Sequence, residues 1–288
     1  MSSNEFLHTV GSGLVSENAF IGTWPVHHLS KFMEFSYSLF LGTFLQRGGS
    51  LTDELKNLDL SRKSFDQFVE FFFNREVVPD DEQYHYFSTD LAGERYDEAV
   101  PSSPTIVVKH MTKLFSAFGE IAPRYSLAQI DQGIWGILGA NLELYQLVFS
   151  DSVPLPNRLE CIRSMYHVYS DFVAKSKTVP DPDLSGFWMW WDLLLHGFWT
   201  PPRPFVPGTY MGDASKLDAE SLVLLEAMFE TLKRILDLPH TETQRCALHG
   251  LGHLQHPDVR DTVQHYIDAN KSDLPLAWLE ECRDGIGQ

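Results

Sequence analysis

The sequence predicts an all-α fold, an α-α superhelix in which antiparallel helix pairs stack side by side within a single domain of 288 residues. Strand patterns are scarce. The one β-branched run, TIVVKH at 105–110, continues with apolar residues three and four apart, which is typical of a helix that begins at Pro104. Apolar residues recur at this spacing through most of the chain. In the second half of the chain the helices form consecutive pairs, the first of which spans about fifty residues. Solenoids of stacked helical repeats are built from helix pairs of roughly 40–47 residues.

Two helices are predicted in the first quarter of the chain, at 25–46 and 64–76. Asp53, and Ser61 or Ser64, stand ahead of the helical periodicity. Their short side chains can accept backbone N–H groups, so we expect them as N-caps. The second helix, FDQFVEFFFNRE, carries aromatic side chains on several faces, which core packing explains.

Further helices are expected at 126–149, 156–176, 183–199, 217–236, 240–255, 257–269 and 273–283. Ser126 and Asp183 are the expected N-caps of the first and third of these. Consecutive helices joined by short turns such as DSVPLP would form the antiparallel pairs. Glycine stands beside large apolar groups in GIWGILG, LLLHGFW and ALHGLGH. We therefore expect these glycines to let neighbouring helices approach closely.

Two segments lack helical periodicity. Residues 77–103 are acidic and bounded by prolines, and residues 200–213 contain four prolines and two glycines, which exclude a long helix. Loops of this length are often functional, and packed connectors between helix pairs are the equal alternative. Residues 1–125 are thus predicted to form irregular helical layers with an acidic loop, and residues 126–288 to form the helix-pair repeats.

The charge of the chain limits its partners. Thirty-nine acidic residues against 22 basic ones give a net charge of −17, and no Lys/Arg cluster opposes it. Such a chain repels phosphate backbones, so direct nucleic-acid binding is not expected. A strongly acidic chain can attract a basic protein partner, but the negative charge can also serve only to keep the protein soluble.

Three scattered cysteines, Cys161, Cys246 and Cys282, form no CxxC pair, which indicates a reducing compartment. The start of the chain lacks the basic and apolar pattern of a signal peptide. The longest apolar stretch, residues 32–45, is 14 residues long and contains Glu34, so it is too short to cross a bilayer. We therefore expect a cytoplasmic protein without a membrane segment.

The end of the chain resembles a HEAT repeat. The sequence QRCALHGLGHLQHPDVRDTVQHYI has an A-x-x-x-L-G-x-L helix from Ala247 to Leu254, a Pro-Asp-Val-Arg turn at 257–260, and a second helix. The ALHGLGH motif also resembles a group of bacterial helical proteins to which no activity is assigned. The resemblance implies a HEAT- or armadillo-like solenoid that ends in a unit at 240–288. It carries over no catalytic residue.

His249 and His253 are the candidate metal ligands. They lie four positions apart on the side of their helix opposite the apolar face, so their rings are close enough to share an ion. The spacing lacks the glutamate of an HExxH enzyme, and a third ligand would have to come from His240, Asp258 or His265. We therefore favour an exposed or concave surface that supplies polar contacts, and we predict no cofactor.

The helix at 183–199 is the candidate wall of a ligand pocket. It is apolar nearly all round, which predicts burial. Its ionisable side chains, Asp192 and His196, lie four apart and can hydrogen-bond to each other or to a common group. A carboxylate that orients an imidazole also serves general-base catalysis, but a structural link is the favoured interpretation. A pocket here would have the proline loop as its rim. Its walls would be Trp188, Trp191 and Trp199.

Two functions stay open. The favoured one is a non-enzymatic helical scaffold that binds another protein, for example a bacterial toxin-immunity-type protein that blocks a basic active site by charge and shape. For that role the acidic loop is an expected contact. The alternative is a small-molecule-binding or metal-dependent enzyme with its site between Asp192/His196 and His249/His253. The sequence leaves the oligomeric state open.

Overall fold

The computed structural model describes residues 59–77, 101–139, 144–175, 185–200, 203–204, 212–269 and 274–285. The chain divides into two compact units, residues 1–49 and 50–288, and all described residues belong to the second. The expected helix at 25–46, the N-caps Asp53 and Asp183, and nearly all of the acidic loop lie outside the described residues. The single domain over the whole chain therefore stays a prediction.

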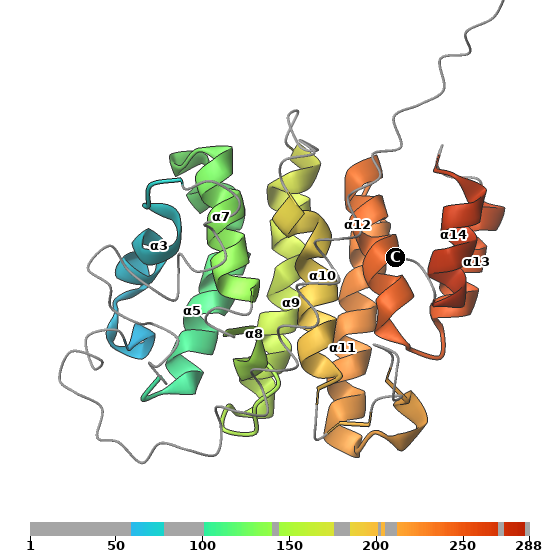
Figure 1. The fold of residues 1–288 in the computed structure, drawn as a ribbon, viewed down its shortest axis with the longest axis horizontal. Helices are drawn as coiled ribbons and strands as arrows, with labels where there is room; N and C mark the ends of the chain where they lie inside the picture. Colours follow the sequence, from blue (N-terminus) through green and yellow to red (C-terminus); the bar gives the residue numbers. More distant parts are fainter. Residues whose placement is uncertain are drawn as a thin grey trace, which may run out of the picture. The chain divides into compact units, whose positions relative to one another are not determined.

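Every regular element of the described residues is a helix, which confirms the predicted all-α class (Figure 1). The first helices are α3 (Phe65–Phe73), α5 (Pro104–Ser116), α6 (Phe118–Ile121), α7 (Leu127–Leu138), α8 (Leu144–Leu147) and α9 (Leu155–Asp171). They are followed by α10 (Ser185–Phe198), α11 (Ala219–Leu236), α12 (Thr241–Leu254), α13 (Val259–Asp268) and α14 (Leu276–Asp284). Short 3-10 helices are η1 (Leu60–Arg62), η3 (Ala122–Arg124), η4 (Val173–Lys175) and η5 (Ala214–Lys216).

Helix starts follow the predicted capping residues. Ser64 and Ser126 each form a capping box with the glutamine three residues later, and α5 begins at Pro104. In α7 the Ser126 hydroxyl accepts from the backbone N–H of Gln129 at 3.3 Å, and the Gln129 side chain accepts from the N–H of Ser126 at 3.0 Å. The expected helix at 126–149 is shorter than predicted, because α7 ends at Leu138 with Gly139 as its C-cap.

Replacing Ser126 by alanine is expected to lower the free energy of unfolding by about 1 kcal/mol, because the N–H of Gln129 then loses its acceptor. Urea unfolding monitored by circular dichroism measures the change. Ser126→Asp is the control, since aspartate also caps helices well and should preserve most of the stability. Equal losses in both variants would contradict the capping role.

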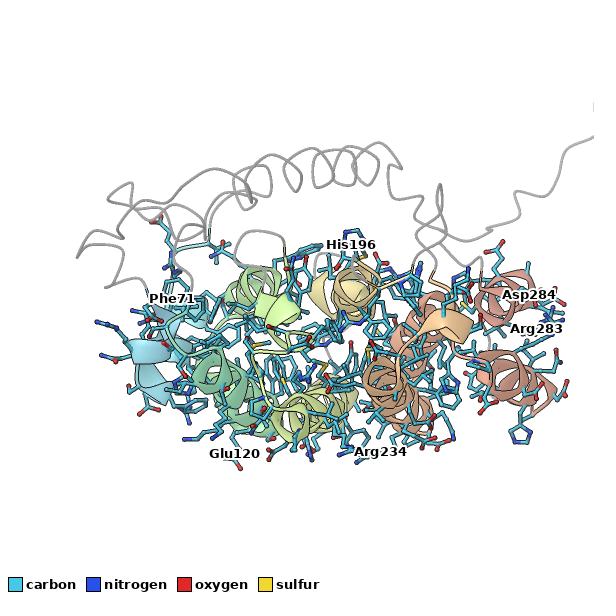
Figure 2. All side chains as sticks on the ribbon, turned by 90° about the horizontal axis from the view of Figure 1, so that it is seen from below. Phe71, Glu120, His196, Arg234, Arg283 and Asp284 are labelled. Atoms are coloured by element: carbon cyan, nitrogen blue, oxygen red, sulfur yellow. The ribbon has the colours of Figure 1, made fainter. Side chains whose placement is uncertain are left out.

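Helices that alternate along the chain pack against each other. α5, α9 and α11 form one series of neighbours, and α7, α10, α12 and α14 form a second series. Figure 2 looks along these helices and shows the two series as two layers, with His196 on the outer side of one and Arg234 on the outer side of the other. α11 packs on α12, and α13 on α14, across the layers. Stacked helix pairs produce this pattern, and the solenoid itself stays a prediction.

The two layers meet through large aromatic side chains. Trp190 of α10 is fully buried and contacts Phe115 of α5 and Tyr169 of α9, with ring centroids 5.0 and 6.3 Å away. Its indole N–H points at the sulfur of Met165, 3.4 Å distant. Edge-to-face packing of this kind suits the charge distribution of aromatic rings. Trp190 thereby joins α10 to both α5 and α9.

Glycines allow close approach within the layers, as expected from the sequence. A Cβ atom at Gly197 of α10 would lie 2.2 Å from the ring of Tyr145, and one at Gly250 of α12 would lie 2.7 Å from the Cβ of Trp191. Neither distance is compatible with van der Waals contact, so both positions require glycine in this packing. No helix among the described residues is long and apolar enough to cross a membrane.

Candidate functional site

α10 is buried on most of its circumference, but one edge remains accessible. Phe187, Trp190 and Leu194 face the other layer, and they are at most 2% exposed. Asp192 and His196 lie on the opposite side and are half-buried, which corrects the expectation of a helix buried all round. Figure 2 places His196 on this outer edge. The ionisable side chains of α10 therefore reach the surface of their layer.

His249 of α12 is not on an exposed surface, contrary to the sequence interpretation. It is only 4% exposed, because Trp188 of α10 covers it. The two rings stack with centroids 4.2 Å apart and planes 24° apart. The apolar stripe of α12 packs as expected, and Leu251 and Leu254 are fully buried. The side opposite that stripe is also covered, because α12 has α10, α11 and α14 as neighbours.

The structure brings most of the predicted site residues together. His253 lies one turn after His249, with ring centroids 4.7 Å apart, and its Nδ1 is 3.8 Å from Oδ1 of Asp192. The guanidinium of Arg245 lies 4.7 Å from the centroid of Trp188. We call these five residues, Trp188, Asp192, Arg245, His249 and His253, the histidine–tryptophan cluster. Trp278 of α14 borders it, with its ring centroid 6.1 Å from that of Trp188.

The environment favours a neutral imidazole at His249 of the cluster and at His196 of α10. Burial lowers the pKa of His249 well below its usual range, and the neighbouring His253 and Arg245 lower it further. Burial also lowers the pKa of His196, although Asp192 opposes that effect. Both rings are therefore uncharged at neutral pH. Neutral imidazole is also the form that binds metals.

The described residues offer no third metal ligand to the two histidines of the cluster. Within the described ranges, no three His, Cys, Asp or Glu side chains come together as ligands. Neither ring nitrogen of His249 has a hydrogen-bond partner among the described residues, and the same holds for Nε2 of His253. The expected pair of metal ligands thus lies close together, but no described residue joins it as the third ligand that a stable site requires.

The three tryptophans of the predicted pocket lie at different places in the fold, and most of the proline loop expected as its rim lies outside the described residues. Trp191 is fully buried against Gly250, and Trp199 is 4% exposed. Trp199 packs on Gly212, where a Cβ atom would lie 1.8 Å from its ring. Trp199 follows Trp188 by eleven residues, about 16 Å along a helix, so the two rings occupy different places. Two hollows on the described surface lie along α3 and between α11 and α13.

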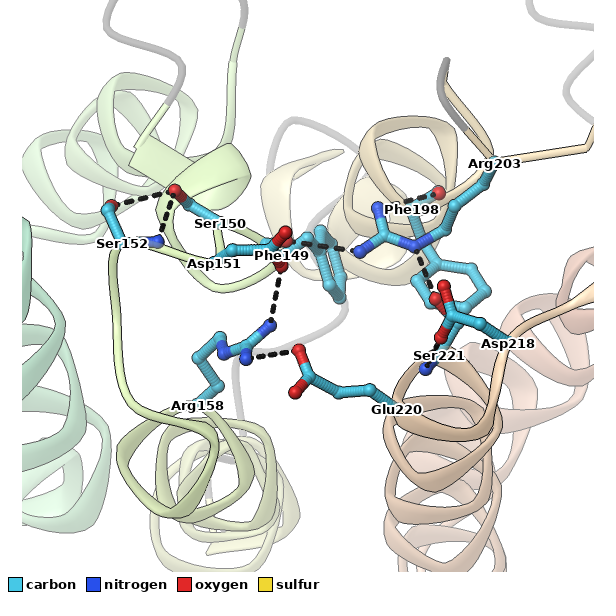
Figure 3. Close-up of polar contacts among 10 residues, drawn as sticks. All are labelled: Phe149, Ser150, Asp151, Ser152, Arg158, Phe198, Arg203, Asp218, Glu220 and Ser221. Atoms are coloured by element: carbon cyan, nitrogen blue, oxygen red, sulfur yellow. Dashed lines mark hydrogen bonds and ion pairs between the residues drawn. The ribbon is translucent and has the colours of Figure 1, made fainter.

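A second polar cluster, which sequence reasoning missed, surrounds two arginines (Figure 3). Arg158 of α9 is only 2% exposed and donates from Nη2 to Glu220 of α11, while its Nη1 lies 3.7 Å from Asp151. Arg203 donates to the hydroxyl of Ser221 at 3.1 Å. It also donates to the carbonyl oxygens of Phe149 and Phe198, at 3.1 and 3.3 Å. The cluster therefore links the ends of α8, α9, α10 and α11.

The sequence contained a signal for Arg158. It stands three and four positions before Cys161 and Ile162, which are fully buried, and seven before the equally buried Met165. Residues at this spacing share one face of a helix, so the arginine falls on the apolar stripe. A charged residue on that stripe requires a partner of opposite charge in the fold.

The outer face of α11 carries the third candidate feature. Leu222 and Val223 are 45% and 43% exposed, although the helix is otherwise amphipathic. Glu226 and Glu230 follow Leu222 at steps of four, so they lie on the same side of the helix. Glu230 pairs with Lys233 at 2.9 Å. We call the set Leu222, Val223, Glu226 and Glu230 the α11 face.

Comparisons with known proteins found no matching family model, no similar curated protein and no similar solved structure. The function therefore has to be inferred from the geometry of these three features. The histidine–tryptophan cluster and the arginine cluster each have a buried centre, His249 in the first and Arg158 in the second. Of the three, the α11 face is the one that offers apolar side chains to solvent.

Proposed function

We propose that this protein is a helical scaffold that binds a basic partner protein through the α11 face. The observation that carries the proposal is the exposure of Leu222 and Val223 beside the carboxylates of Glu226 and Glu230. Apolar groups contribute about 25 cal/mol for each Å² that a partner covers. The carboxylates would lie at the rim, where charges act mainly on the rate and specificity of association.

The charge of the surrounding region supports a basic partner. Residues 212–269 contain ten acidic and five basic residues, and the whole chain carries a net charge of −17. An excess of one sign speeds the encounter with a partner of the other sign, and salt weakens that effect. A toxin-immunity-type protein, which blocks a basic active site by charge and shape, is the specific form of this proposal.

Substituting the two apolar residues of the α11 face tests the proposal. Wild type and Leu222→Ser/Val223→Ser are immobilised and exposed to a lysate of the source cells, and the retained proteins are identified by mass spectrometry at low and high salt. We expect wild type to retain a basic protein at low salt, and the variant to retain at least tenfold less of that protein. The reason is that truncating central apolar contacts commonly costs more than 1 kcal/mol of binding free energy.

Ile106→Ser is the matched control, since Ile106 lies on α5 and is 40% exposed. It removes a similar apolar side chain from a different helix, so it should retain the partner as wild type does. Equal retention by all three proteins would contradict binding through the α11 face. Retention that is unchanged at high salt would contradict the electrostatic part of the proposal.

A further inference from the structure

The hollow between α11 and α13 combines an apolar floor with carboxylates from two helices. Its volume is about 360 Å³. Leu236 of α11 and Tyr266 of α13, which line it, are 7% and 4% exposed. Asp237, at the end of α11, and Asp261, in the first turn of α13, also line it, and both are exposed. The apolar side chains therefore form the floor of the hollow, and the two carboxylates lie at its rim.

The hollow continues the α11 face along the same helix. Lys233 and Asp237 follow Glu230 at steps of three and four positions. They therefore lie on the same side of α11 as Leu222, which precedes Glu230 by two such steps. Leu222 and Asp237 are about 22 Å apart along the helix axis, at 1.5 Å per residue. A protein interface of standard size covers about 800 Å² on each partner, so one partner can span the α11 face and the hollow together.

Asp237 occupies a position that is unfavourable for the helix that carries it. It is the C-cap of α11, where the helix dipole opposes a negative charge. The basic residues of the last turn are bound to other groups. Lys233, which also lines the hollow, lies 2.9 Å from Glu230, and the guanidinium of Arg234 lies 4.0 Å from the ring centroid of Tyr166. No described residue forms an ion pair with Asp237, so a cation supplied by a partner would offset its unfavourable charge.

We propose that the hollow binds an arginine side chain of the basic partner, an assignment that rests on the proposed function of the α11 face. The aliphatic stem of the arginine packs on Leu236 and Tyr266, and its guanidinium donates to Asp237 and Asp261 at the rim. Arginine suits two carboxylates from different helices better than lysine, because its planar group offers five donors in fixed directions. Arginines that fill a pocket at the centre of an interface often carry a large share of the binding free energy.

A titration with N-acetyl-arginine amide tests the hollow without the partner. The probe is added to the isotope-labelled full-length protein, and amide shifts are followed by NMR. We expect shifts centred on the hollow that saturate only at millimolar probe, because one side chain supplies a small part of an interface. N-acetyl-citrulline amide has nearly the same shape without the charge, and N-acetyl-lysine amide has the charge without the planar group. Both should bind at least about fivefold more weakly.

Equal binding of the citrulline or the lysine probe would overturn the assignment to arginine, and so would shifts that lie away from the hollow. Asp237→Asn/Asp261→Asn should weaken binding of the arginine probe at least about fivefold. Glu280→Gln/Glu281→Gln removes the same charge from exposed positions of α14 and should bind the probe as wild type does.

The single variant Asp237→Asn decides the test if the double aspartate variant does not fold. Removing a carboxylate from the C-terminal end of α11 does not weaken that helix, because the helix dipole disfavours the charge there. Affinity for the arginine probe that is unchanged in the aspartate variants would overturn the proposal.

The capture experiment separates the hollow from the α11 face as a whole. A basic protein that Leu222→Ser/Val223→Ser fails to retain should also be retained at least about fivefold less by Asp237→Asn/Asp261→Asn. Retention by the aspartate variant at the level of wild type would overturn the role of the hollow and leave the α11 face as the binding surface. Equal retention by Leu222→Ser/Val223→Ser and wild type would instead contradict the α11 face itself, whatever the arginine probe shows.

Discussion

Trp190→Ala is expected to lower the free energy of unfolding by about 3–5 kcal/mol, the range found when a fully buried tryptophan is truncated. The indole occupies the space between the two layers, where it contacts Phe115 of α5 and Tyr169 of α9. Its removal therefore loses contacts of three helices at once and leaves a cavity that the packed helices cannot close. Urea unfolding by circular dichroism measures the loss, provided that the variant is folded without denaturant.

Two further variants test whether the loss of stability comes from the cavity at the buried indole. Trp190→Phe retains an aromatic ring and should recover most of the stability, because smaller changes of volume leave smaller cavities. Trp278→Ala removes the same type of side chain from α14, where it is only half-buried, and should cost clearly less. A loss below about 1 kcal/mol for Trp190→Ala would contradict its position between the layers.

Glu220→Ala is expected to lower the free energy of unfolding by about 3 kcal/mol, because it leaves the guanidinium of Arg158 buried without its main partner. Arg158 is 2% exposed, and the carboxylate of Asp151 is 94% exposed and 3.7 Å away, so it replaces Glu220 poorly. Breaking a buried ion pair on one side costs more than the pair itself contributes. Chemical unfolding again measures the difference.

Replacing the arginine instead of the glutamate should lower the free energy of unfolding much less. Arg158→Met fills the buried position with an apolar side chain, and Glu220 is 45% exposed, so water can solvate it. Glu230→Ala breaks an exposed pair on the same helix and should change the stability by less than about 0.5 kcal/mol. Equal effects of Glu220→Ala and Glu230→Ala would contradict the account of a buried arginine that depends on one carboxylate.

Features that depend on a few neighbouring residues could be predicted from the sequence. The caps at Ser64 and Ser126 and the start of α5 at Pro104 agree with the structure, because each depends on contacts within one helical turn. The break after Leu138 was not predictable in the same way. Apolar residues continue beyond Gly139 at helical spacing, so periodicity alone extends the helix across it.

The candidate site was only partly accessible to sequence reasoning. The spacing of His249 and His253 correctly predicts that they share one side of a helix. The residue that covers this side at His249 is Trp188, some sixty positions earlier in the sequence. A helical wheel identifies an apolar stripe and contains no information on a neighbour that covers the polar side. Arg158 differs, because its place on a buried stripe was visible in the pattern of Cys161 and Ile162.

The packing of alternate helices also has a consequence for how the chain reaches this fold. α9 packs on α5 and α11, and α10 on α7 and α12, so each of these contacts closes a loop that contains an entire further helix. Closing such loops costs chain entropy before any contact compensates for it. Folding rates fall as the sequence separation between contacting residues grows. This arrangement should therefore form more slowly than a bundle of the same helices in which each packs mainly on the next.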